Sequence, residues 1–454
     1  MSLHNSSQVL RAPAGHLPLQ SREPPLRGPS LTTWGPPARA HLGCVAVLCL
    51  EKLFYQRGKV MRKILMYRWK AYNYKDIKYS FEKLGYEVKE VYQDLLNYDV
   101  DEEFAARLRG IIKAEVFDFV FTVNYFPLIS NVCQECSILY VCWSCDNPLI
   151  SMYHQSVFND VNRIFLFDLT NVEEFKGMGV EHVYHLPLAV NCERLDYLFA
   201  NSKDEELYHN DISFVGSLYE KNSYDKMEYN LPDYLRGYFE ALMEAQRDLQ
   251  GANIIDRMLT PEILMELENY FELEKSEDSL SDLNLIFSVT TLGFKIAEKQ
   301  RRRILIDLSK HHDVSIYTNS RTSDLIRVNA KGSVDYWSEM PLVFKNSKIN
   351  LNITIPNIKS GVPLRVYDIL GAGGFCLTNF QAELPMQFEN AKHLVWYYSN
   401  EDLYEKTEYY LEHDSERTEI ATNGRIYVET YCTYENRIEE LLKTIKYSKN
   451  KQHT

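Results

Sequence analysis

The strongest candidate for a ligand site is the segment 355–368, with the sequence IPNIKSGVPLRVYD. Its pattern predicts a polar loop followed by a helix over 363–370, and the unpaired amides at the start of a helix attract anions. The loop residues expected to contact an anion are Lys359, Ser360 and Gly361. Arg365 lies in the first helical turn, where a cation opposes the helix dipole at a cost of about 0.3–1 kcal/mol. A bound diphosphate would make that cation favourable, so the segment predicts a diphosphate site.

Asp368 adds a second ligand group to the same helix face. It follows Arg365 by three residues, and residues three apart are neighbours on a helix surface. A carboxylate there can accept two hydrogen bonds from the diol of a ribose. The alternative is that Arg365 and Asp368 form an ordinary ion pair on the surface. The agreement of the loop, the arginine and the aspartate favours ligand binding.

Two glycine-containing runs are more ambiguous. Gly216 ends a predicted strand, and Lys221 follows in a loop from which its ammonium could reach a phosphate. An ordinary solvated lysine is the simpler interpretation of Lys221. Gly373 and Gly374 follow a helix, whereas phosphate loops precede one, so they are better explained as a helix C-cap and a turn. They would still allow a ligand to come near the backbone.

A second group of candidates follows strands in the N-terminal half of the chain. Trp143, Asp146 and Asn147 stand at the end of a predicted strand over 139–143, and ligands bind at the carboxyl ends of strands in parallel sheets. Asp146 could bind a sugar hydroxyl or act in catalysis, or it could cap the following turn. His185 closes the last strand of this half, where a structural role is equally consistent with the sequence.

Four cysteines raise the question of a zinc site. They form two C-x-x-C pairs, at 133–136 and 142–145, but five residues separate the pairs, where zinc motifs usually have about 15–20. Cys142 and Cys145 lie at or just beyond a strand, in which residues three apart point to opposite faces. We therefore interpret these cysteines as small core residues and expect neither a metal nor a cofactor.

The composition excludes several classes of protein. The 454 residues carry 50 Lys and Arg against 63 Asp and Glu, a net charge of −13, which argues against a nucleic-acid binder. The run Arg301–Arg303 is then best explained as the solvated face of a helix. Nine cysteines are too few for a secreted disulfide scaffold, and no apolar run reaches the ~18–20 residues of a membrane span. The sequence therefore predicts a soluble, cytoplasmic protein.

Residues 1–60 differ from the rest of the chain. They hold seven of the 16 prolines, and seven Lys and Arg against two Glu give them a charge of +5. This composition predicts a disordered extension. A sharper hypothesis is that the segment is non-native and that Met61 is the true start, because Arg57-Gly58-Lys59 can be encoded by a purine-rich stretch resembling a bacterial ribosome-binding site.

The elements that would position these residues are alternating strands and helices, which predict doubly wound parallel sheets. A first domain is expected over 61–190, with strands at 63–69, 86–92, 117–124, 139–143, 163–168 and 182–188. After a polar linker over 191–210, a second domain is expected over 211–434, with strands at 211–218, 314–318, 349–353 and 375–378. A helical insertion would occupy about 225–310, and a last helix and tail 435–454. Two such domains enclose a cleft between the carboxyl ends of their strands.

Two blocks of the chain resemble the CgeB-like glycosyltransferases, a spore-maturation type within the bacterial group 1 family. The first block comprises YVCWSCDNP at 140–148, IFLFD at 164–168 and YHLPLA at 184–189. The second comprises SKINLNIT at 347–354, GVPLRVYDILGAGGF at 361–375, and the stretch from YLEHD to IATNG between 410 and 424. The resemblance covers about residues 61–446.

The resemblance implies a GT-B fold, in which two Rossmann-like domains face a cleft and a C-terminal helix crosses back to the first domain. It also implies transfer of a sugar from a nucleotide diphosphate sugar to an unnamed acceptor, usually with retention and without a metal. Asp146 and Arg365 would act in catalysis, and the acceptor side would hold Trp143, Asp146, Asn147 and His185. The donor would contact Gly216, Lys221, Lys359, Ser360, Gly361, Arg365, Asp368, Gly373 and Gly374.

The chain departs from the family pattern at two points. The broader group has two glutamates eight positions apart; the second matches Asp368, whereas the first falls on Ser360. The group also places an Arg and a Lys after the glycine that matches Gly216, whereas here Ser217 takes the Arg position and Lys221 is one residue off the usual spacing. Two alternatives therefore stay open: a non-catalytic nucleotide-sugar-binding protein of a spore or envelope assembly, and an epimerase of the GT-B type.

Overall fold

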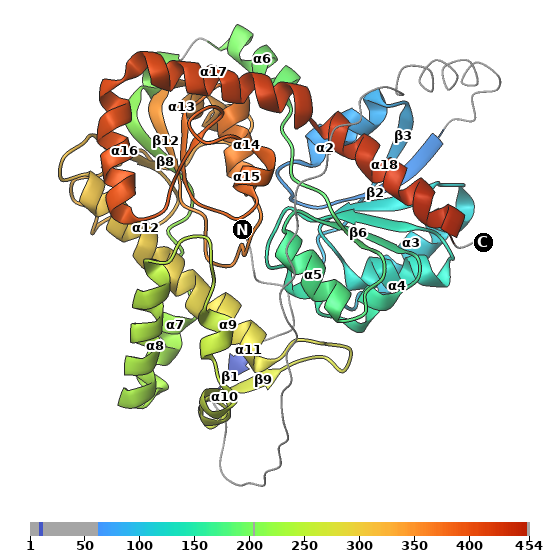
Figure 1. Cartoon of the computed structure of the whole chain (residues 1–454). Coiled ribbons are helices and arrows are strands. Elements are labelled where there is room, and N and C mark those ends of the chain that lie inside the picture. Colours follow the sequence, from blue (N-terminus) through green and yellow to red (C-terminus); the bar gives the residue numbers. More distant parts are fainter. Residues whose placement is uncertain (1–8, 12–61, 203–204, 452–454) are drawn as a thin grey trace, which may run out of the picture.

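The computed structural model describes residues 9–11, 62–202 and 205–451. Its main feature is a pair of six-stranded parallel sheets, each flanked by helices (Figure 1). The predicted α/β fold class, with two doubly wound domains, is therefore confirmed. In the first sheet, Ile64 and Met66 pack into one apolar layer and Leu65 and Tyr67 into the opposite layer, as expected for a sheet that is covered on both faces.

The first sheet has the strand order β3-β2-β4-β5-β6-β7, and all its pairings are parallel. All six strands predicted for the first domain are present. They are β2 (Arg62–Arg68), β3 (Tyr86–Tyr92), β4 (Phe119–Val123), β5 (Tyr140–Trp143), β6 (Asn162–Leu166) and β7 (Val183–His185). The helices between them are α2 (Tyr74–Lys83), α3 (Glu102–Ala114), α4 (Pro127–Glu135) and α5 (Leu169–Gly177).

The second sheet has the strand order β11-β10-β8-β12-β13-β14, again parallel throughout. The four predicted strands are present, and two very short edge strands were missed. The six are β8 (Asn210–Val215), β10 (Val314–Tyr317), β11 (Asn329–Ala330), β12 (Ser347–Asn352), β13 (Cys376–Asn379) and β14 (Val395–Tyr397). Around them lie α13 (Met340–Asn346), α14 (Leu364–Gly371), α15 (Leu384–Gln387), α16 (Asn400–Glu412) and α17 (Asp414–Tyr431).

The segment that was predicted as a polar linker contains a helix. Asn191 caps the start of α6 (Cys192–Asn201), because its side chain accepts a hydrogen bond from the Arg194 amide. A 3-10 turn at Glu205–Tyr208 follows. The helix is fixed to the second domain, since the Arg425 guanidinium on α17 lies 2.7 Å from the Asp196 carboxylate.

The helical insertion has its own apolar core and extends below the second domain in Figure 1. It comprises α7 (Tyr224–Met227), α8 (Asp233–Arg247), α9 (Ile255–Met258), α10 (Pro261–Leu267), β9 (Glu272–Glu274), α11 (Leu283–Ile286), a π-helical stretch at Phe287–Gly293 and α12 (Phe294–Leu308). A loop of the insertion also reaches the first domain. The Leu280 amide donates to the Tyr153 carbonyl at 2.8 Å, and the Gln155 amide donates to the Asp278 carbonyl at 2.8 Å.

The last helix, α18 (Tyr434–Lys451), packs on the first domain, as predicted (Figure 1). Its residues Ile438, Leu441 and Ile445 are buried in the same apolar layer as Phe81 of α2. Within residues 1–60, Val9–Arg11 form β1, which pairs antiparallel with β9; the prediction of an extension falls otherwise outside the described residues. None of the helices in the described ranges is long and apolar enough to cross a membrane.

Candidate functional site

In open parallel sheets, ligands bind where the strand order reverses. In the second sheet this point lies between β8 and β12, and in the first it lies between β2 and β4. The side chains that follow these four strands therefore form the candidate site.

Arg301 occupies the switch point of the second sheet. It comes from the middle of α12, and its guanidinium donates to the carbonyl oxygens of Ser217 at 2.7 Å and Ile353 at 2.6 Å, which follow β8 and β12. Its Nε is buried and has no hydrogen-bond partner in the described part of the chain. Burial lowers the pKa of this guanidinium, although an arginine side chain remains protonated in proteins. A cation with an unused donor thus lies where a ligand is expected.

Two aromatic rings hold this guanidinium in place. The Cζ atom of Arg301 lies 5.3 Å from the ring centre of Phe214 and 5.0 Å from that of Tyr219, within the range of cation–π attraction. Tyr219 has a positive φ of 59°, and its ring stacks on Phe294 at 5.0 Å. A positive φ is unusual for a bulky residue, and such outliers cluster at ligand sites.

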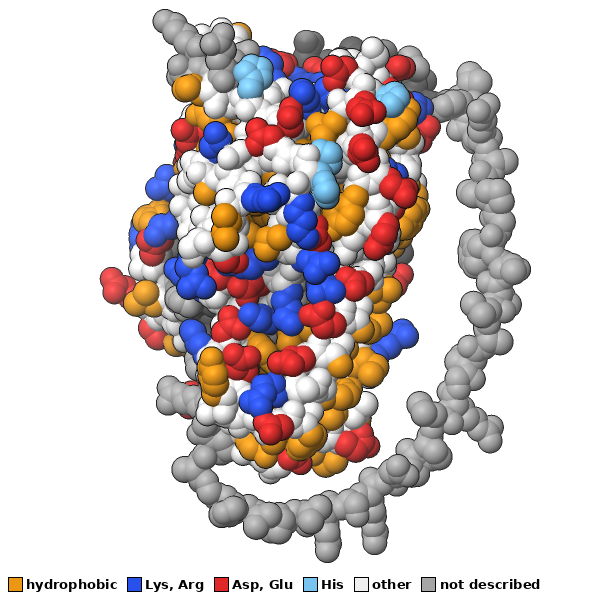
Figure 2. Space-filling model, turned by 90° about the vertical axis from the view of Figure 1, so that its left-hand side faces the viewer, with side chains coloured by type: hydrophobic (Ala, Val, Ile, Leu, Met, Phe, Trp, Pro, Cys, Tyr) orange, Lys and Arg blue, Asp and Glu red, His pale blue; other side chains and the backbone are white. Residues whose placement is uncertain are grey.

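The interpretation of Arg301–Arg303 as a solvated helix face is wrong for Arg301. Arg303 is exposed, and Arg302 pairs with Asp324 at 2.6 Å. Figure 2 shows Lys and Arg side chains alternating with Asp and Glu on the face at the left of Figure 1. Carboxylates therefore neutralise the neighbours of Arg301, whereas Arg301 itself forms no ion pair with a described residue.

Arg365 brings a second guanidinium to the same end of the sheet. It lies in the first turn of α14, and its charge adds to burial in lowering the pKa of Arg301. Its Cζ atom lies 5.4 Å from the ring centre of Phe344, and its Nη1 contacts the sulfur of Met340. Two guanidinium groups whose positive charges repel each other are stabilised by an anion that binds between them.

Asp368 lies beside Arg365 on α14, as predicted, with Oδ2 3.8 Å from the Arg365 Nη1. Its Oδ1 accepts a hydrogen bond from the Tyr336 hydroxyl at 3.0 Å. Burial raises the pKa of Asp368 to about 6, against the opposing charge of Arg365. The two side chains therefore do form an ion pair, but Asp368 is buried, so it is not the surface pair considered as an alternative. The ribose contact stays a prediction.

Asp146 follows β5, the strand beside β4, and Asn124, which follows β4 at the switch point of the first sheet, holds it. Asn124 follows β4 with a positive φ of 66°, and its Nδ2 donates to the Asp146 Oδ2 at 2.8 Å. Its Oδ1 accepts from the Cys145 amide at 2.9 Å. Burial raises the pKa of Asp146. Burial also raises the pKa of Tyr219; the positive charge of Arg301 opposes this shift, and the negative charge of Asp146 adds to it. Asp146 and the arginine site are thus close in space; the sequence analysis missed Asn124, although an Asn directly after a buried strand was a usable signal.

The loop ahead of α14 binds an anion, but this anion belongs to the protein. Oδ2 of Asp168 accepts hydrogen bonds from the amides of Lys359 at 2.8 Å, Ser360 at 3.0 Å and Gly361 at 3.2 Å. Asp168 is a buried residue of the first domain that caps α5. The amides predicted to receive a diphosphate are therefore occupied in this structure. No local sequence pattern could reveal a partner about 190 residues away.

Ser360 and Glu383 extend this contact between the domains. The Ser360 hydroxyl lies 2.8 Å from both Asp168 Oδ1 and Glu383 Oε1, so it can donate to either carboxylate. Glu383 also accepts from the Leu169 amide at 2.7 Å, and its Oε2 lies 2.7 Å from Nε2 of His185. Ser360 thus contacts protein at the position where the resembled family has a sugar-binding glutamate, and His185 lies in the domain interface.

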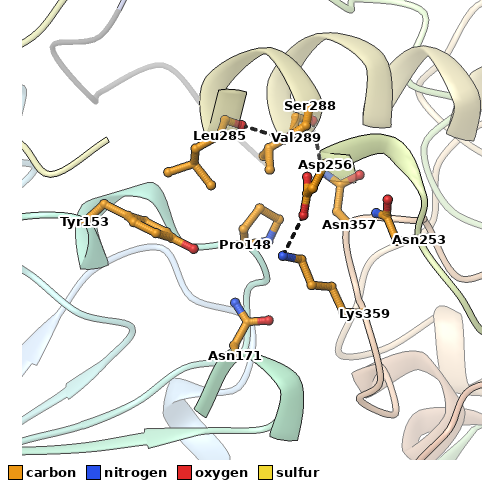
Figure 3. A pocket seen from close by; sticks show the side chains of 10 residues that line it. All are labelled: Pro148, Tyr153, Asn171, Asn253, Asp256, Leu285, Ser288, Val289, Asn357 and Lys359. Carbon is orange, nitrogen blue, oxygen red and sulfur yellow. Dashed lines mark hydrogen bonds and ion pairs between the residues drawn. The ribbon is translucent and has the colours of Figure 1, made fainter. Parts of the chain in front are cut away.

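Lys359 joins three parts of the chain. Its Nζ lies 2.9 Å from Oδ2 of Asp256 in the insertion and 3.5 Å from Oε2 of Glu174 in the first domain. The pocket beside it is lined by Pro148, Tyr153, Asn171, Asn253, Asp256, Leu285, Ser288, Val289, Asn357 and Lys359 (Figure 3). Figure 3 shows the Lys359 ammonium directed at Asp256. In this structure Lys359 therefore forms ion pairs rather than an open phosphate contact.

The structure assigns other roles to two residues predicted on the acceptor side. Trp143 is 2% exposed, and its ring centre lies 5.9 Å from that of Tyr434 on α18. It belongs to the core, so the prediction that it meets an acceptor is wrong. Asn147 donates to Asp168 Oδ2 at 2.8 Å and supports the contact between the domains.

Three glycines that were predicted to contact the donor also differ in their roles. Gly373 has a φ of 76° and ends α14, and a Cβ on Gly374 would lie 2.5 Å from the Phe344 carbonyl oxygen. Both stand at the far end of α14 from Arg365, which supports the C-cap interpretation and not the donor contact. A Cβ on Gly216 would lie 3.6 Å from the Arg301 Nη1, so Gly216 does line the arginine site. Lys221 lies on an exposed loop.

Comparison with protein families gives a match over the later part of the second domain and the start of α18. Residues 299–443, about a third of the chain, match the model of a family described as glycosyl transferase-like. The matched segment contains Arg301, Arg365 and Asp368. A comparison with curated proteins finds no match.

Several solved structures have a similar backbone. Anabaena Alr3699/HepE in complex with UDP and glucose has a TM-score of 0.48 at 9% identity, over 85% of this chain and 100% of its own. A glycosyltransferase from Rickettsia africae has a TM-score of 0.46 at 13% identity, over 86% and 98% of the two chains. The N-terminal domain of trehalose-6-phosphate phosphatase from Candida albicans has a TM-score of 0.49 at 10% identity, over 86% and 98%.

Proposed function

We propose that the protein is a CgeB-like glycosyltransferase that uses a nucleotide diphosphate sugar as donor. The observation that carries this proposal is the pair Arg301 and Arg365 at the switch point of the second sheet. Within the described part of the chain, the buried Nε of Arg301 has no hydrogen-bond partner and its guanidinium forms no ion pair. Burial lowers the pKa of Arg301, and the charge of Arg365 lowers it further. A diphosphate bound between the two would satisfy both cations. The family match supports the proposal because it spans both arginines.

The remaining groups of the site fit the parts of such a donor. The Asp368 carboxylate would accept hydrogen bonds from the ribose diol, in place of the Tyr336 hydroxyl that it now binds at 3.0 Å. In the transition state, negative charge develops on the departing diphosphate, and the two guanidinium groups would stabilise it without a metal. Asp146, held by Asn124 at 2.8 Å, would face the acceptor hydroxyl from the first domain. Retention of configuration is proposed on the family resemblance alone.

Calorimetry with UDP tests the proposed donor site. We expect Arg301→Ala and Arg365→Ala each to weaken UDP binding by about 10–100-fold, since a hydrogen bond to a charged group contributes ~1.5–3 kcal/mol. Arg303→Ala is the matched control, because Arg303 is on the same helix but exposed and paired with Asp307. Unchanged affinity in the first two variants would remove the diphosphate from this position.

The non-catalytic alternative is favoured by one observation. Ser360, which stands where the family has a glutamate that contacts the sugar, lies 2.8 Å from Asp168 and from Glu383. A protein that binds a nucleotide sugar without this contact could serve as a structural part of a spore or envelope assembly. Analysis of the products formed from UDP-sugars distinguishes the possibilities: a transferase releases UDP, an epimerase changes the sugar, and a binding protein does neither.

A further inference from the structure

We propose that Asp168 is an autoinhibitory latch between the two domains. In the closed arrangement its carboxylate fills the anion site formed by the 359–361 amides, and an anion from solution can enter only after Asp168 withdraws. The latch goes beyond the proposed function, which places the donor diphosphate between Arg301 and Arg365. It concerns a phosphate-type anion at the 359–361 amides, which precede the same helix α14.

The 359–361 loop provides donors of the kind that an oxyanion requires. Three consecutive amides donate to one oxygen of Asp168 at 2.8–3.2 Å, and consecutive amides of this kind form the anion-binding concavity called a nest. The side-chain amide of Asn147 reaches the same oxygen at 2.8 Å. The second oxygen accepts from the Asn171 amide at 3.3 Å and lies 2.8 Å from the Ser360 hydroxyl. A phosphate oxygen makes the same demand on N–H donors as this carboxylate does.

Asp168 and an external anion exclude each other for steric reasons. A Cβ placed on Gly361 would lie 2.9 Å from the Phe167 carbonyl oxygen and 3.0 Å from the Asp168 Cα. The backbones of the two domains are therefore already in contact beside the nest. A phosphate could reach the amides only if this part of the first domain moved away.

Withdrawal of Asp168 requires the two domains to separate along the part of their interface that surrounds Asp168 and the 359–361 loop, which we call the seam. Asp168, Leu169 and His185 belong to the first domain, whereas the nest and Glu383 belong to the second. The Leu169 amide and the His185 ring each lie 2.7 Å from the Glu383 carboxylate. These contacts break together when the seam opens, so a single movement exposes the amides and frees Ser360.

Hydrogen–deuterium exchange of the full chain, read from peptides that resolve residues 359–361, tests the latch. Asp168→Asn is the informative variant, because Asn retains the helix cap of α5 but presents no negative charge to the nest. We expect these amides to exchange at least about tenfold faster in Asp168→Asn than in the wild type. Inorganic pyrophosphate should slow their exchange again in the variant and have little effect on the wild type at the same concentration.

Two controls accompany this experiment. Asp196→Asn removes an exposed carboxylate that pairs with Arg425 at 2.7 Å, and its 359–361 amides should exchange as in the wild type. A thermal melt of each variant shows whether it is folded, and Ser360→Ala, which leaves the carboxylate in place, should give an intermediate exchange rate.

Either of two results overturns the latch. Amides that stay protected in Asp168→Asn would show that the carboxylate does not close the nest, and fast exchange that pyrophosphate leaves unchanged would show that the nest takes no external anion. Failure of UDP to bind at Arg301 and Arg365 would remove the proposed function, whereas the pyrophosphate experiment would still decide the latch.

Discussion

Nε2 of His185 lies 2.7 Å from Oε2 of Glu383, and this contact joins the last strand of the first sheet to the second domain. Burial alone would lower the pKa of His185, but the hydrogen bond and charge of Glu383 outweigh it and raise the pKa above 6.5. The stabilisation from a raised histidine pKa is complete below the unfolded value and is lost as the pH rises through the folded one. The contact between His185 and Glu383 should therefore stabilise the seam more in mild acid than at alkaline pH.

The first prediction follows from this sign. His185→Gln should lower the free energy of unfolding more at about pH 6 than at about pH 8, because only the protonated ring gains from Glu383. Urea denaturation of both proteins at the two pH values measures the difference. His311→Gln, an exposed site, serves as the control. An equal loss at both pH values would mean that the ring acts here only through packing.

The second prediction concerns Asp368, whose pKa burial raises to about 6. Its contribution to stability is present below 3.8, the ordinary pKa of an aspartate in the unfolded chain, and is lost as the pH rises through about 6. Asp368→Asn should therefore stabilise the protein near neutral pH by about 1–3 kcal/mol, while it weakens UDP binding. Denaturation at about pH 5 and pH 8 provides an internal control, since the gain should shrink in acid. A loss of stability at pH 8 would contradict the expected cost of the buried charge.

The third prediction distinguishes two contributions of Asn124 to stability, its backbone conformation and its side-chain hydrogen bond. Asn124→Ala loses the 2.8 Å bond to Asp146 and places a less tolerant residue at a φ of 66°, which should cost about 1–3 kcal/mol of stability. Asn124→Gly should recover the backbone part of the loss, because glycine adopts positive φ freely. Neither variant should recover donor turnover if Asp146 needs this partner. Full turnover in the glycine variant would show that Asp146 keeps its position without the hydrogen bond from Asn124.

The fourth prediction uses the close approach at Gly361. A methyl group there would lie 2.8 Å from the Phe167 ring and 2.9 Å from the Phe167 carbonyl oxygen, so Gly361→Ala should push the domains apart and increase the radius of gyration in solution scattering. Gly110→Ala is a matched control inside α3, where a Cβ meets nothing within 4 Å. That change should raise stability by about 0.5–1 kcal/mol without altering the shape. An unchanged radius in Gly361→Ala would mean that the loop yields instead of the seam.

Much of the architecture could be predicted from the sequence because it is written in local patterns. The six strands of the first sheet are short apolar runs between helices, and a sheet buried on both faces requires such runs. β11 and β14 were missed because two and three residues at a sheet edge leave no period to detect. The site was harder, since its residues meet only in three dimensions.

Arg301 shows why the site could not be predicted fully. Three consecutive arginines on one helix point in three directions, and only the packing of α12 decides which one meets the sheet. The π-helical stretch Phe287–Gly293 precedes α12, and its wider turns shift the faces of a helix, so a regular period cannot be carried across it. Nothing in the sequence marked Asp168 as a contact between the domains, because a helix cap looks the same with or without a partner in another domain.

The position of α18 has a consequence for how the chain acquires its fold. Ile438, Leu441 and Ile445 complete an apolar layer whose other members, such as Ile64 and Phe81, are translated first. On the ribosome, this layer stays open until α18 (Tyr434–Lys451) has emerged. Maturation of the N-terminal half must therefore wait for the C-terminal one, against the usual order in which domains fold as they are synthesised.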